Sequence, residues 1–507
     1  MGTALSRLTG FLRLAAITYA IGLGALTDTY TLANNTPNIV YELLLGGVLS
    51  ATLVPIFVHH TEEDDDEGTS AVITVATAGL VAIVVAGMVA APWIVRLYTV
   101  TAERGVAAEQ REVATALLRL FMPQMLFYGL TAMGTAVLNA RRRFAAPAYA
   151  PVLNNLIVTA MLFALPHVAG HTPKLDDVSN DNGLLLLLGL GTTTGIVAMT
   201  VVLLPAIRRS GFRFRWNLDL RNPAVREVGR MSGWTLGYVV ANQVALLIVL
   251  LLANRQISGV ASYTAAYVFF LLPHALVAVS LMTTIVPELA SAWRRQDPDA
   301  YRERFSLGVR LMTLIVLPAA TGYVLLAKPI IRALLEHGAL GTQPAAASLT
   351  ADNLAMFAIG LLGFSIYLFT LRGFYALRDT RTPFFLNLGE NALNIALAFA
   401  LEPSLGVPGL ALAYGIAYTV GGAAALLVLR ARIGRLDLKR ILQSVVRIGA
   451  ACAVMAVAVA AVERSVGEWP IVQTAAGIVV GAAVFGACTL LFRVEEVAAL
   501  RARLVRR

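Results

Sequence analysis

The chain has 507 residues, of which 58% are hydrophobic and only 14% are charged, and its mean hydropathy is +0.73. Soluble proteins carry about 25% charged residues, so this composition excludes an ordinary water-soluble protein and predicts an all-α protein that crosses a membrane many times. The net charge of +10 lies in basic stretches between apolar runs, which argues against a nucleic-acid-binding protein.

Apolar segments long enough to cross a bilayer recur along the whole chain, and hydropathy predicts fourteen of them. Prolines 37, 123 and 273 interrupt three of these spans, since proline removes a backbone N–H and bends or breaks a helix. Gly46 and Gly47 interrupt the second span as well. The predicted spans lie near residues 5–26, 28–58, 69–98, 110–138, 147–168, 183–207, 225–253, 257–291, 304–326, 351–377, 383–401, 406–430, 441–462 and 470–492.

The connections between the spans differ in charge. Those after spans 4, 6, 8, 10 and 12 are rich in arginine, whereas those after spans 1, 5, 7, 9, 11 and 13 hold few basic residues, among them Lys174, Arg255 and Arg464. By the positive-inside rule, the arginine-rich connections and both termini are cytoplasmic. The acidic run at residues 62–67 falls on the same side, where we expect a solvated turn.

Three sequence patterns occur twice along the chain, in the same order and at similar spacing. They predict a duplicated unit of six helices, and an even number of helices returns the chain to the same side of the membrane. The two lobes should therefore be related by an axis along the membrane normal, which places a substrate site between them. We expect an N-lobe at 1–210, a C-lobe at 211–435, and an appendage of two helices with a basic tail at 436–507. The paired patterns are Arg7-Leu-Thr-Gly-Phe11 with Arg230-Met-Ser-Gly-Trp234, Val54-Pro55 with Val286-Pro287, and Ala-x-Arg-x4-Pro-x7-Asn starting at Ala140 and at Ala376.

The first two predicted spans carry four ionisable side chains: Arg7, Arg13, Asp28 and Glu42. An ionised group at the bilayer centre costs about 2.5–3.5 kcal/mol, so such residues usually face protein or water and mark a transport path. Arg13 is the deeper arginine and is expected to face a cavity, whereas Arg7 is either a headgroup anchor or a cavity residue. Asp28 either complements its helix dipole or contacts a gate, and Glu42 either neutralises Arg13 or carries a proton.

Further polar residues interrupt otherwise apolar spans. The segment 34–38, which ends at Asn38, either exposes backbone groups to a substrate or caps a kink. Arg372 is either an anchor or a substrate contact, and His274 is expected to be packed rather than catalytic. The remaining polar positions expected at the lobe interface are Asn154, Asn155, Glu390, Asn391 and Asn394.

Enzymatic motifs are missing from the sequence, which contains no GxxxxGK[ST] loop, no HExxH and no CxxC pair. We therefore expect a transporter that is neither an enzyme nor an ATP-driven pump and that needs no metal or cofactor. The membrane potential or a cation would then drive it, since each unit charge is worth about 2.3 kcal/mol per 100 mV. Cys452 and Cys488 lie within apolar runs and are expected to be buried thiols.

A family resemblance rests on motifs that extend over all the predicted spans and become sparser after about residue 400. On these residues the chain resembles the MurJ (MviN) family of lipid II flippases in the MOP transporter superfamily, and residues 41–47 resemble its actinobacterial branch. The motif residues include Ser6-Arg7, Gly10, Arg13, Asp28, Pro37-Asn38, Val54-Pro55, Leu138-Asn139, Pro147-Ala148, Gly373-Phe374-Tyr375-Ala376 and Asp379-Thr380-Arg381-Thr382-Pro383.

The resemblance implies a protein of peptidoglycan synthesis in a bacterial plasma membrane. Family members are understood to move lipid II, an undecaprenyl-pyrophosphate-linked disaccharide pentapeptide, from the inner to the outer leaflet through a cationic cavity between two lobes. Arginine suits this substrate because its guanidinium binds diphosphate oxygens in forked pairs. The predicted substrate-binding residues are Arg7, Arg13, Asp28, Asn38, Glu42, Asn154, Arg255 and Arg372, of which the first three match family residues important for function.

The chain also departs from the family pattern. Tyr41, Glu42 and Gly46 stand where many members have an arginine pair and then a glutamate, and a usual arginine aligns near Val268. Arg255 or Arg372 would be the compensating residue.

Two other functions remain open. The first is export of another polyprenyl-linked glycan, or cation-coupled drug export by a protein of the same superfamily, for which Glu42 or Glu390 would be the proton-carrying acid. The second is a non-transporting scaffold for cell-wall synthesis. The expected partners are lipid II or a similar glycolipid, membrane lipids and cell-wall synthesis proteins, and no nucleic acid.

Overall fold

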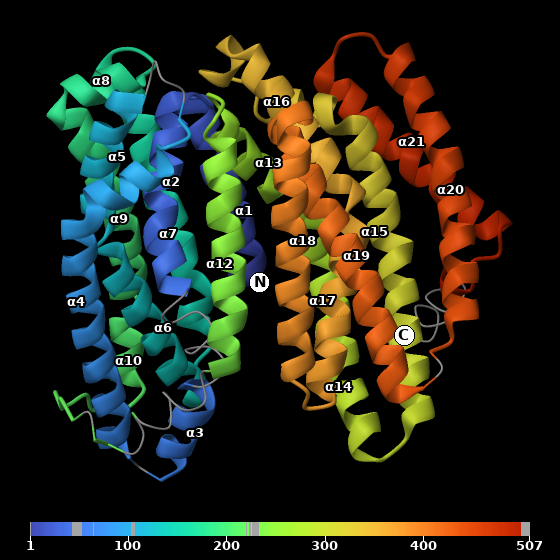
Figure 1. The fold of residues 1–507 in the computed structure, drawn as a ribbon, viewed down its shortest axis with the longest axis horizontal. Helices are drawn as coiled ribbons and strands as arrows, with labels where there is room; N and C mark the ends of the chain where they lie inside the picture. The colour runs from blue at the N-terminus through green and yellow to red at the C-terminus, as the bar shows by residue number, and fades with distance from the viewer. Residues whose placement is uncertain are drawn as a thin grey trace. The chain divides into compact units, whose positions relative to one another are not determined.

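A computed structural model describes residues 2–42, 53–63, 65–102, 107–219, 221–222, 225, 233–434 and 436–497 (Figure 1). Within these ranges every regular element is a helix, which confirms the predicted all-α class. The chain folds as two compact units, each described by itself below. The first unit comprises Met1–Ala261 and His337–Gln343, and the second comprises Ser262–Glu336 and Pro344–Arg507.

The first unit is a bundle in which α1 packs along α7, α7 along α9, and α2 against α5. Leu117, Phe121, Leu162 and Leu188 form the centre of its apolar core and are fully buried. Its helices are α1 (Gly2–Ala20), α2 (Ala25–Tyr41), α3 (Val54–Glu62), α4 (Asp66–Tyr98), α5 (Ala107–Phe121), α6 (Gln124–Ala140), α7 (Ala145–Ala169), α8 (Leu175–Asn180), α9 (Asn182–Val201), α10 (Leu204–Arg209), α12 (Gly233–Ala253) and η4 (Leu340–Thr342).

The second unit is built around α15, which packs against α14, α16, α20 and α21. Its core contains stacked aromatic rings, among them Phe305 and Phe369 with centroids 5.0 Å apart. Its helices are α13 (Gly259–Pro273), whose first turn belongs to the first unit, η3 (His274–Ala278), α14 (Val279–Arg294), α15 (Pro298–Leu334), α16 (Pro344–Ile359), α17 (Leu361–Ala376), α18 (Arg381–Leu405), α19 (Val407–Ile433), α20 (Leu438–Ser465) and α21 (Pro470–Leu491).

Ten helical segments of the described residues are long and apolar enough to cross a membrane, or eleven if the bent pair α16–α17 counts as one span. These segments correspond to predicted spans 3–6 and 8–14. Spans 1, 2 and 7 are occupied by α1, α2 and α12, which are shorter or more polar. The number of fourteen spans is compatible with the structure and stays a prediction.

Two of the three predicted proline interruptions are confirmed. Pro123 separates α5 from α6, and Pro273 is followed by the π-helical turn η3. At the third, Pro37, α2 continues to Tyr41, so the helix does not end there, and a bend at this proline stays a prediction. Gly46 and Gly47 lie outside the described residues.

A bend that the sequence did not predict lies at Gly360, where α16 and α17 meet at 49°. A Cβ atom at this glycine would overlap the backbone of Gly415 on α19. The two helices therefore approach α19 too closely for any side chain at this position.

The predicted duplication is visible in matching backbone turns. After α6 and after α17, Arg142 and Arg378 both adopt the left-handed conformation, with φ of 57° and 60°. The residue that follows each donates its N–H to the carbonyl five residues earlier, at 2.8 Å for Arg143 and 3.0 Å for Asp379. This is the hydrogen bond of a Schellman turn, and its two copies lie at the same place in the repeated Ala-x-Arg pattern.

A second pair of matching turns lies at the same distance after the repeated pairs Val54-Pro55 and Val286-Pro287. The Asp65 carboxylate accepts the Gly68 N–H at 2.8 Å at the start of α4, and the Asp297 carboxylate accepts the Ala300 N–H at 2.9 Å at the start of α15. These matches support a duplicated helical unit.

The compact units and the predicted lobes do not coincide. The helix α12 groups with the first unit, although the sequence places it in the C-lobe. The lobe boundaries near residues 210 and 435 therefore stay a prediction.

The acidic run before α4 is not simply a solvated turn, and that expectation was wrong for two of its members. Asp65 caps α4, as described above, and Asp66 accepts a hydrogen bond from the Arg141 guanidinium at 2.6 Å. The prediction of buried thiols is confirmed for Cys452 and Cys488.

Candidate functional site

Arg13 lies half-buried on α1 and faces the interior of the first unit. Its guanidinium is within electrostatic range of the phenol groups of Tyr30 on α2 and Tyr128 on α6. The Tyr30 hydroxyl is 3.1 Å from Thr192 Oγ1 on α9, and the Tyr128 ring lies 5.5 Å from the Tyr41 ring. Arg13 thus lies near the phenol groups of two other helices, as expected for a charge within a span.

The side chain of Asn155 joins α1, which carries Arg7 and Arg13, to α7, which carries Asn154. Asn155 on α7 donates its Nδ2 to the Ser6 carbonyl and to Thr9 Oγ1 on α1, both at 3.1 Å. Asn154 is buried beside it, and its Oδ1 has no hydrogen-bond partner in the described residues. Arg7 is exposed on α1. The α1–α7 pair therefore joins the helix of Arg7 and Arg13 to the helix of Asn154, while the Asn154 side chain itself lies against Gly195 on α9.

Asp28 lies in the first turn of α2, as its predicted role toward the helix dipole requires, and it also makes contacts that were not predicted. Its side chain is 2% exposed, and its two carboxylate oxygens accept the backbone N–H groups of Ser258 at 2.6 Å and Ala261 at 2.7 Å. The carboxylate thus fastens the start of α2 to the turn between α12 and α13. Arg255 lies exposed in that same turn.

Asn38 and Glu42 lie at the carboxyl end of α2. Asn38 is half-buried and donates its Nδ2 to the Asn34 carbonyl of the same helix at 3.1 Å. Glu42 is exposed at the end of the helix.

Arg372 is the predicted site residue in the second unit. It is exposed on α17, with its guanidinium 6.0 Å from the Tyr375 ring, a cation–π distance. His274 is buried, with Nδ1 at 3.0 Å from Ser365 Oγ, so the prediction of a packed histidine is confirmed.

The polar residues predicted on α18 are all buried. Asn391 donates its Nδ2 to the Asn387 carbonyl at 2.9 Å. The two carboxylate oxygens of Glu390 and the Oδ1 of Asn394 have no hydrogen-bond partner in the described residues. Buried polar atoms without partners are rare in folded proteins, so these side chains are candidates for a functional role.

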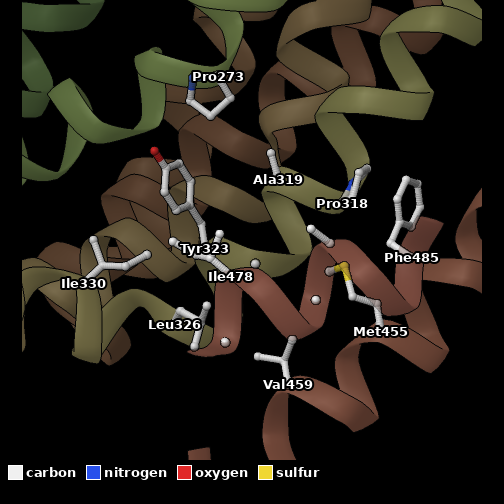
Figure 2. A pocket seen from close by; sticks show the side chains of 14 residues that line it. Pro273, Pro318, Ala319, Tyr323, Leu326, Ile330, Met455, Val459, Ile478 and Phe485 are labelled. Atoms are coloured by element: carbon white, nitrogen blue, oxygen red, sulfur yellow. The ribbon is translucent and has the colours of Figure 1, made fainter. Parts of the chain in front are cut away.

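A pocket of about 370 Å³ between α15, α20 and α21 was not predicted from the sequence (Figure 2). The available signal was the pair Gly477 and Gly481, one helical turn apart on α21, which leaves space on one face of that helix. The pocket can receive a hydrocarbon chain because its walls are almost entirely apolar. Its lining includes Pro273, Pro318, Gly322, Tyr323, Leu326, Met455, Val459, Ile478 and Phe485.

A helical bundle with many apolar spans, a duplicated architecture and polar groups buried within those spans defines a multi-pass membrane transporter. Solved structures agree on the fold. A structure titled as lipid II flippase MurJ in an inward closed conformation covers 97% of this chain and 98% of its own, with a TM-score of 0.78 and 20% identity. An inward-facing multidrug MATE transporter of the MOP superfamily covers 86% and 99%, with a TM-score of 0.69 and 14% identity.

Sequence comparison then identifies the family. The model of the family described as lipid II flippase MurJ matches residues 17–480, so the chain belongs to the MurJ family. The lipid II flippase MurJ of Burkholderia cenocepacia is 28% identical over 441 residues, which is 85% of this chain and 82% of that protein. A probable lipid II flippase MurJ of Haemophilus influenzae is 28% identical over 424 residues, 78% of this chain and 80% of that protein. Arg7 and Arg13 precede the matched range, whereas the other predicted site residues lie within it.

Proposed function

We propose that this protein translocates lipid II from the inner to the outer leaflet of the bacterial plasma membrane. The observation that carries the proposal is the family match over residues 17–480, which includes most of the helical bundle. The arginine-rich connections support an orientation with both termini in the cytoplasm. The protein acts as a transporter and not as an enzyme.

The substrate sets two physical requirements. Its sugar diphosphate must be kept away from hydrocarbon, whereas its long apolar tail belongs in hydrocarbon. A polar cavity that opens to each leaflet in turn, through relative motion of the two lobes, meets the first requirement. Arg13 supplies a fixed positive charge within α1, and its forked donors match the oxygens of a diphosphate.

The apolar pocket of the second unit meets the second requirement. We propose that it holds part of the polyprenyl tail, because its walls come from spanning helices and carry almost no polar atoms. A Cβ atom at Gly322, which lines this pocket, would have no neighbour within 4 Å, so a side chain there begins in open space.

The driving force is a separate part of the proposal. An inside-negative potential favours outward movement of a net anionic complex by about 2.3 kcal/mol per charge and 100 mV. Coupling to a cation is the second candidate, and the buried Glu390 carboxylate, whose oxygens have no partner in the described residues, favours it. Cell-wall synthesis proteins remain proposed partners.

The test is complementation of a bacterial strain depleted of its own lipid II flippase. We expect the wild-type chain to restore growth, Arg13→Ala to fail at normal abundance in the membrane, and Arg13→Lys to restore growth in part, because lysine keeps the charge but loses the fork. Arg143→Ala is the matched control, since Arg143 is an exposed arginine outside the spans. Full rescue by Arg13→Ala would overturn the role of Arg13, and failure of the wild-type chain would overturn the function.

A further inference from the structure

A second pocket of the second unit is distinct from every residue predicted for transport. It has a volume of about 810 Å³, and arginine-rich turns at the carboxyl ends of α14, α17 and α19 line it. Three turns far apart in the sequence form it. Its lining consists of Trp293, Arg294, Gln296, Pro298, Arg302, Arg378, Arg432, Ile433 and Gly434.

The four arginines of this pocket are not neutralised to the same extent. Arg302 pairs with Asp299 at 2.7 Å, and Arg432 pairs with Asp379 at 3.1 Å. Among the residues that the structure describes, no carboxylate lies within ion-pair distance of Arg294 or Arg378. The pocket therefore keeps two uncompensated positive charges beside two that are held in place.

The first copy of the duplicated unit shows what occupies the corresponding place there. At the start of α4, Asp66 accepts the backbone N–H of Arg213 at 3.0 Å, and Ser70 accepts that of Arg215 at 3.1 Å. The segment after α10 thus lies along α4 and uses these acceptors. Counted from the repeated Val-Pro pair, Arg302 stands at the position of Ser70, so the second copy has a donor where the first has an acceptor.

The entrance to the two places is otherwise alike. Gly211 and Gly434, which follow the ends of α10 and α19 within two residues, have φ of 84° and 83°. In each copy a carbonyl just before the glycine accepts a hydrogen bond from an arginine guanidinium, at 3.0 Å from Arg141 and at 2.8 Å from Arg302, although these two arginines stand at different positions of the repeat. The same turn therefore leads to a groove that the chain fills in the first copy. In the second copy it leads to an arginine-lined pocket.

The side chains that line the pocket indicate which kind of ligand it binds. Guanidinium groups bind phosphate oxygens with two parallel hydrogen bonds, and basic pockets between spanning helices hold lipid headgroups. Trp293, 39% exposed, lines the pocket. Exposed tryptophan side chains at the ends of spans mark the headgroup level of a membrane.

We propose that this pocket binds the phosphate of an anionic membrane phospholipid. Trp293 and the position at the ends of spanning helices favour a lipid headgroup over a free anion. The proposal does not depend on the transported substrate, because none of the predicted transport residues lines the pocket.

The test is native mass spectrometry of the purified full chain with phosphatidylglycerol and phosphatidylcholine as probes. We expect preferential binding of phosphatidylglycerol by the wild type and an affinity about 30-fold lower in Arg294→Gln/Arg378→Gln, which corresponds to two basic contacts of about 1 kcal/mol each. These arginines are chosen because their removal leaves no described carboxylate without its partner. Glutamine is compatible with the backbone at residue 378, since Gln296 adopts a similar φ of 57°.

The matched control is Arg142→Gln/Arg143→Gln, which removes the same charge at the repeat-related turn of the first unit. We expect it to bind phosphatidylglycerol within about twofold of the wild type, and thermal unfolding verifies that both double variants are folded. An equal loss in the control would show only diffuse attraction and would overturn the proposal. Binding of inorganic phosphate or of a phosphopeptide with the same dependence on Arg294 and Arg378, without preference for phosphatidylglycerol, would overturn it as well.

Discussion

Removal of the Asp28 carboxylate should destabilise the first unit without any change in the apolar core. The two oxygens of this side chain accept the backbone N–H groups of Ser258 and Ala261, and the side chain is 2% exposed. Asp28→Ala deletes both acceptors and leaves two backbone donors unsatisfied. Each buried unsatisfied group costs about 1–3 kcal/mol, so we expect a loss of about 2–6 kcal/mol in the free energy of unfolding.

Asp28→Asn changes the hydrogen bonds of this side chain while keeping its size nearly the same. The amide keeps one acceptor oxygen but presents an NH₂ group to the second backbone donor, so one of the two hydrogen bonds is lost. We expect a cost of about 1–3 kcal/mol, between wild type and Asp28→Ala. Glu112→Ala, at an exposed acid of α5 in the same unit, should change stability by less than about 0.5 kcal/mol.

The assay is denaturant unfolding of the purified protein in detergent, combined with hydrogen exchange of the backbone amides at 255–261. The exchange of these amides should accelerate in Asp28→Ala, because the variant releases the turn between α12 and α13. If Asp28→Ala unfolds at the same denaturant concentration as Glu112→Ala, the two hydrogen bonds contribute nothing measurable and the reasoning fails.

Three further predictions concern the second unit. Arg310→Met should cost about 3–5 kcal/mol by leaving the buried Glu496 carboxylate without its partner, and adding Glu496→Gln should recover part of that loss in the same unfolding assay. Burial raises the pKa of Asp379, but hydrogen bonds from a neighbouring hydroxyl and backbone N–H and an adjacent guanidinium outweigh burial and lower it. The ionised Asp379 should therefore stabilise the fold above the ordinary carboxyl pKa of 3.8, and this stabilisation should disappear as the pH falls through the lower pKa of the folded state. In an acid titration, the free energies of unfolding of wild type and Asp379→Asn should therefore converge at low pH. Gly322→Leu should fill the apolar pocket and reduce flippase complementation while the protein stays folded, whereas Gly449→Leu, also at a glycine with open space, should not; equal growth of the two variants would argue against a role for the pocket.

The sequence predicted most of the helical architecture because hydropathy and proline act locally. Pro123 and Pro273 interrupt their helices as expected, since a missing N–H is felt within one turn. The bend at Gly360 could not be predicted, because its cause is a close approach to Gly415, which lies on another helix further along the chain. The uninterrupted path of α2 through Pro37 shows the converse, as tertiary packing can keep a helix continuous through proline.

The site was predicted less completely than the fold. Arg13 and Asp28 stood out in the sequence because each is a charged residue within an apolar span. The sequence could not show that Arg13 lies near tyrosines of other helices, whereas Asp28 accepts hydrogen bonds from a backbone turn. The backbone donors that bind Asp28 are separated from it by 230 and 233 residues, a distance that no local pattern records. The apolar pocket was missed for the same reason, since Gly322 and Phe485 become neighbours of one cavity only when α15 packs against α21.

The two copies of the duplicated unit share backbone turns but differ in the side chains around them. A left-handed residue at the end of a helix costs free energy unless its turn satisfies the last carbonyls, so a turn that does so constrains the backbone strongly. Arg142 and Arg378 retain such a turn in both copies. The side chains around it are not constrained in this way. The copies were therefore able to diverge, so that Ser70 binds a neighbouring segment of its own chain whereas Arg302, at the same place in the second copy, lines an open pocket.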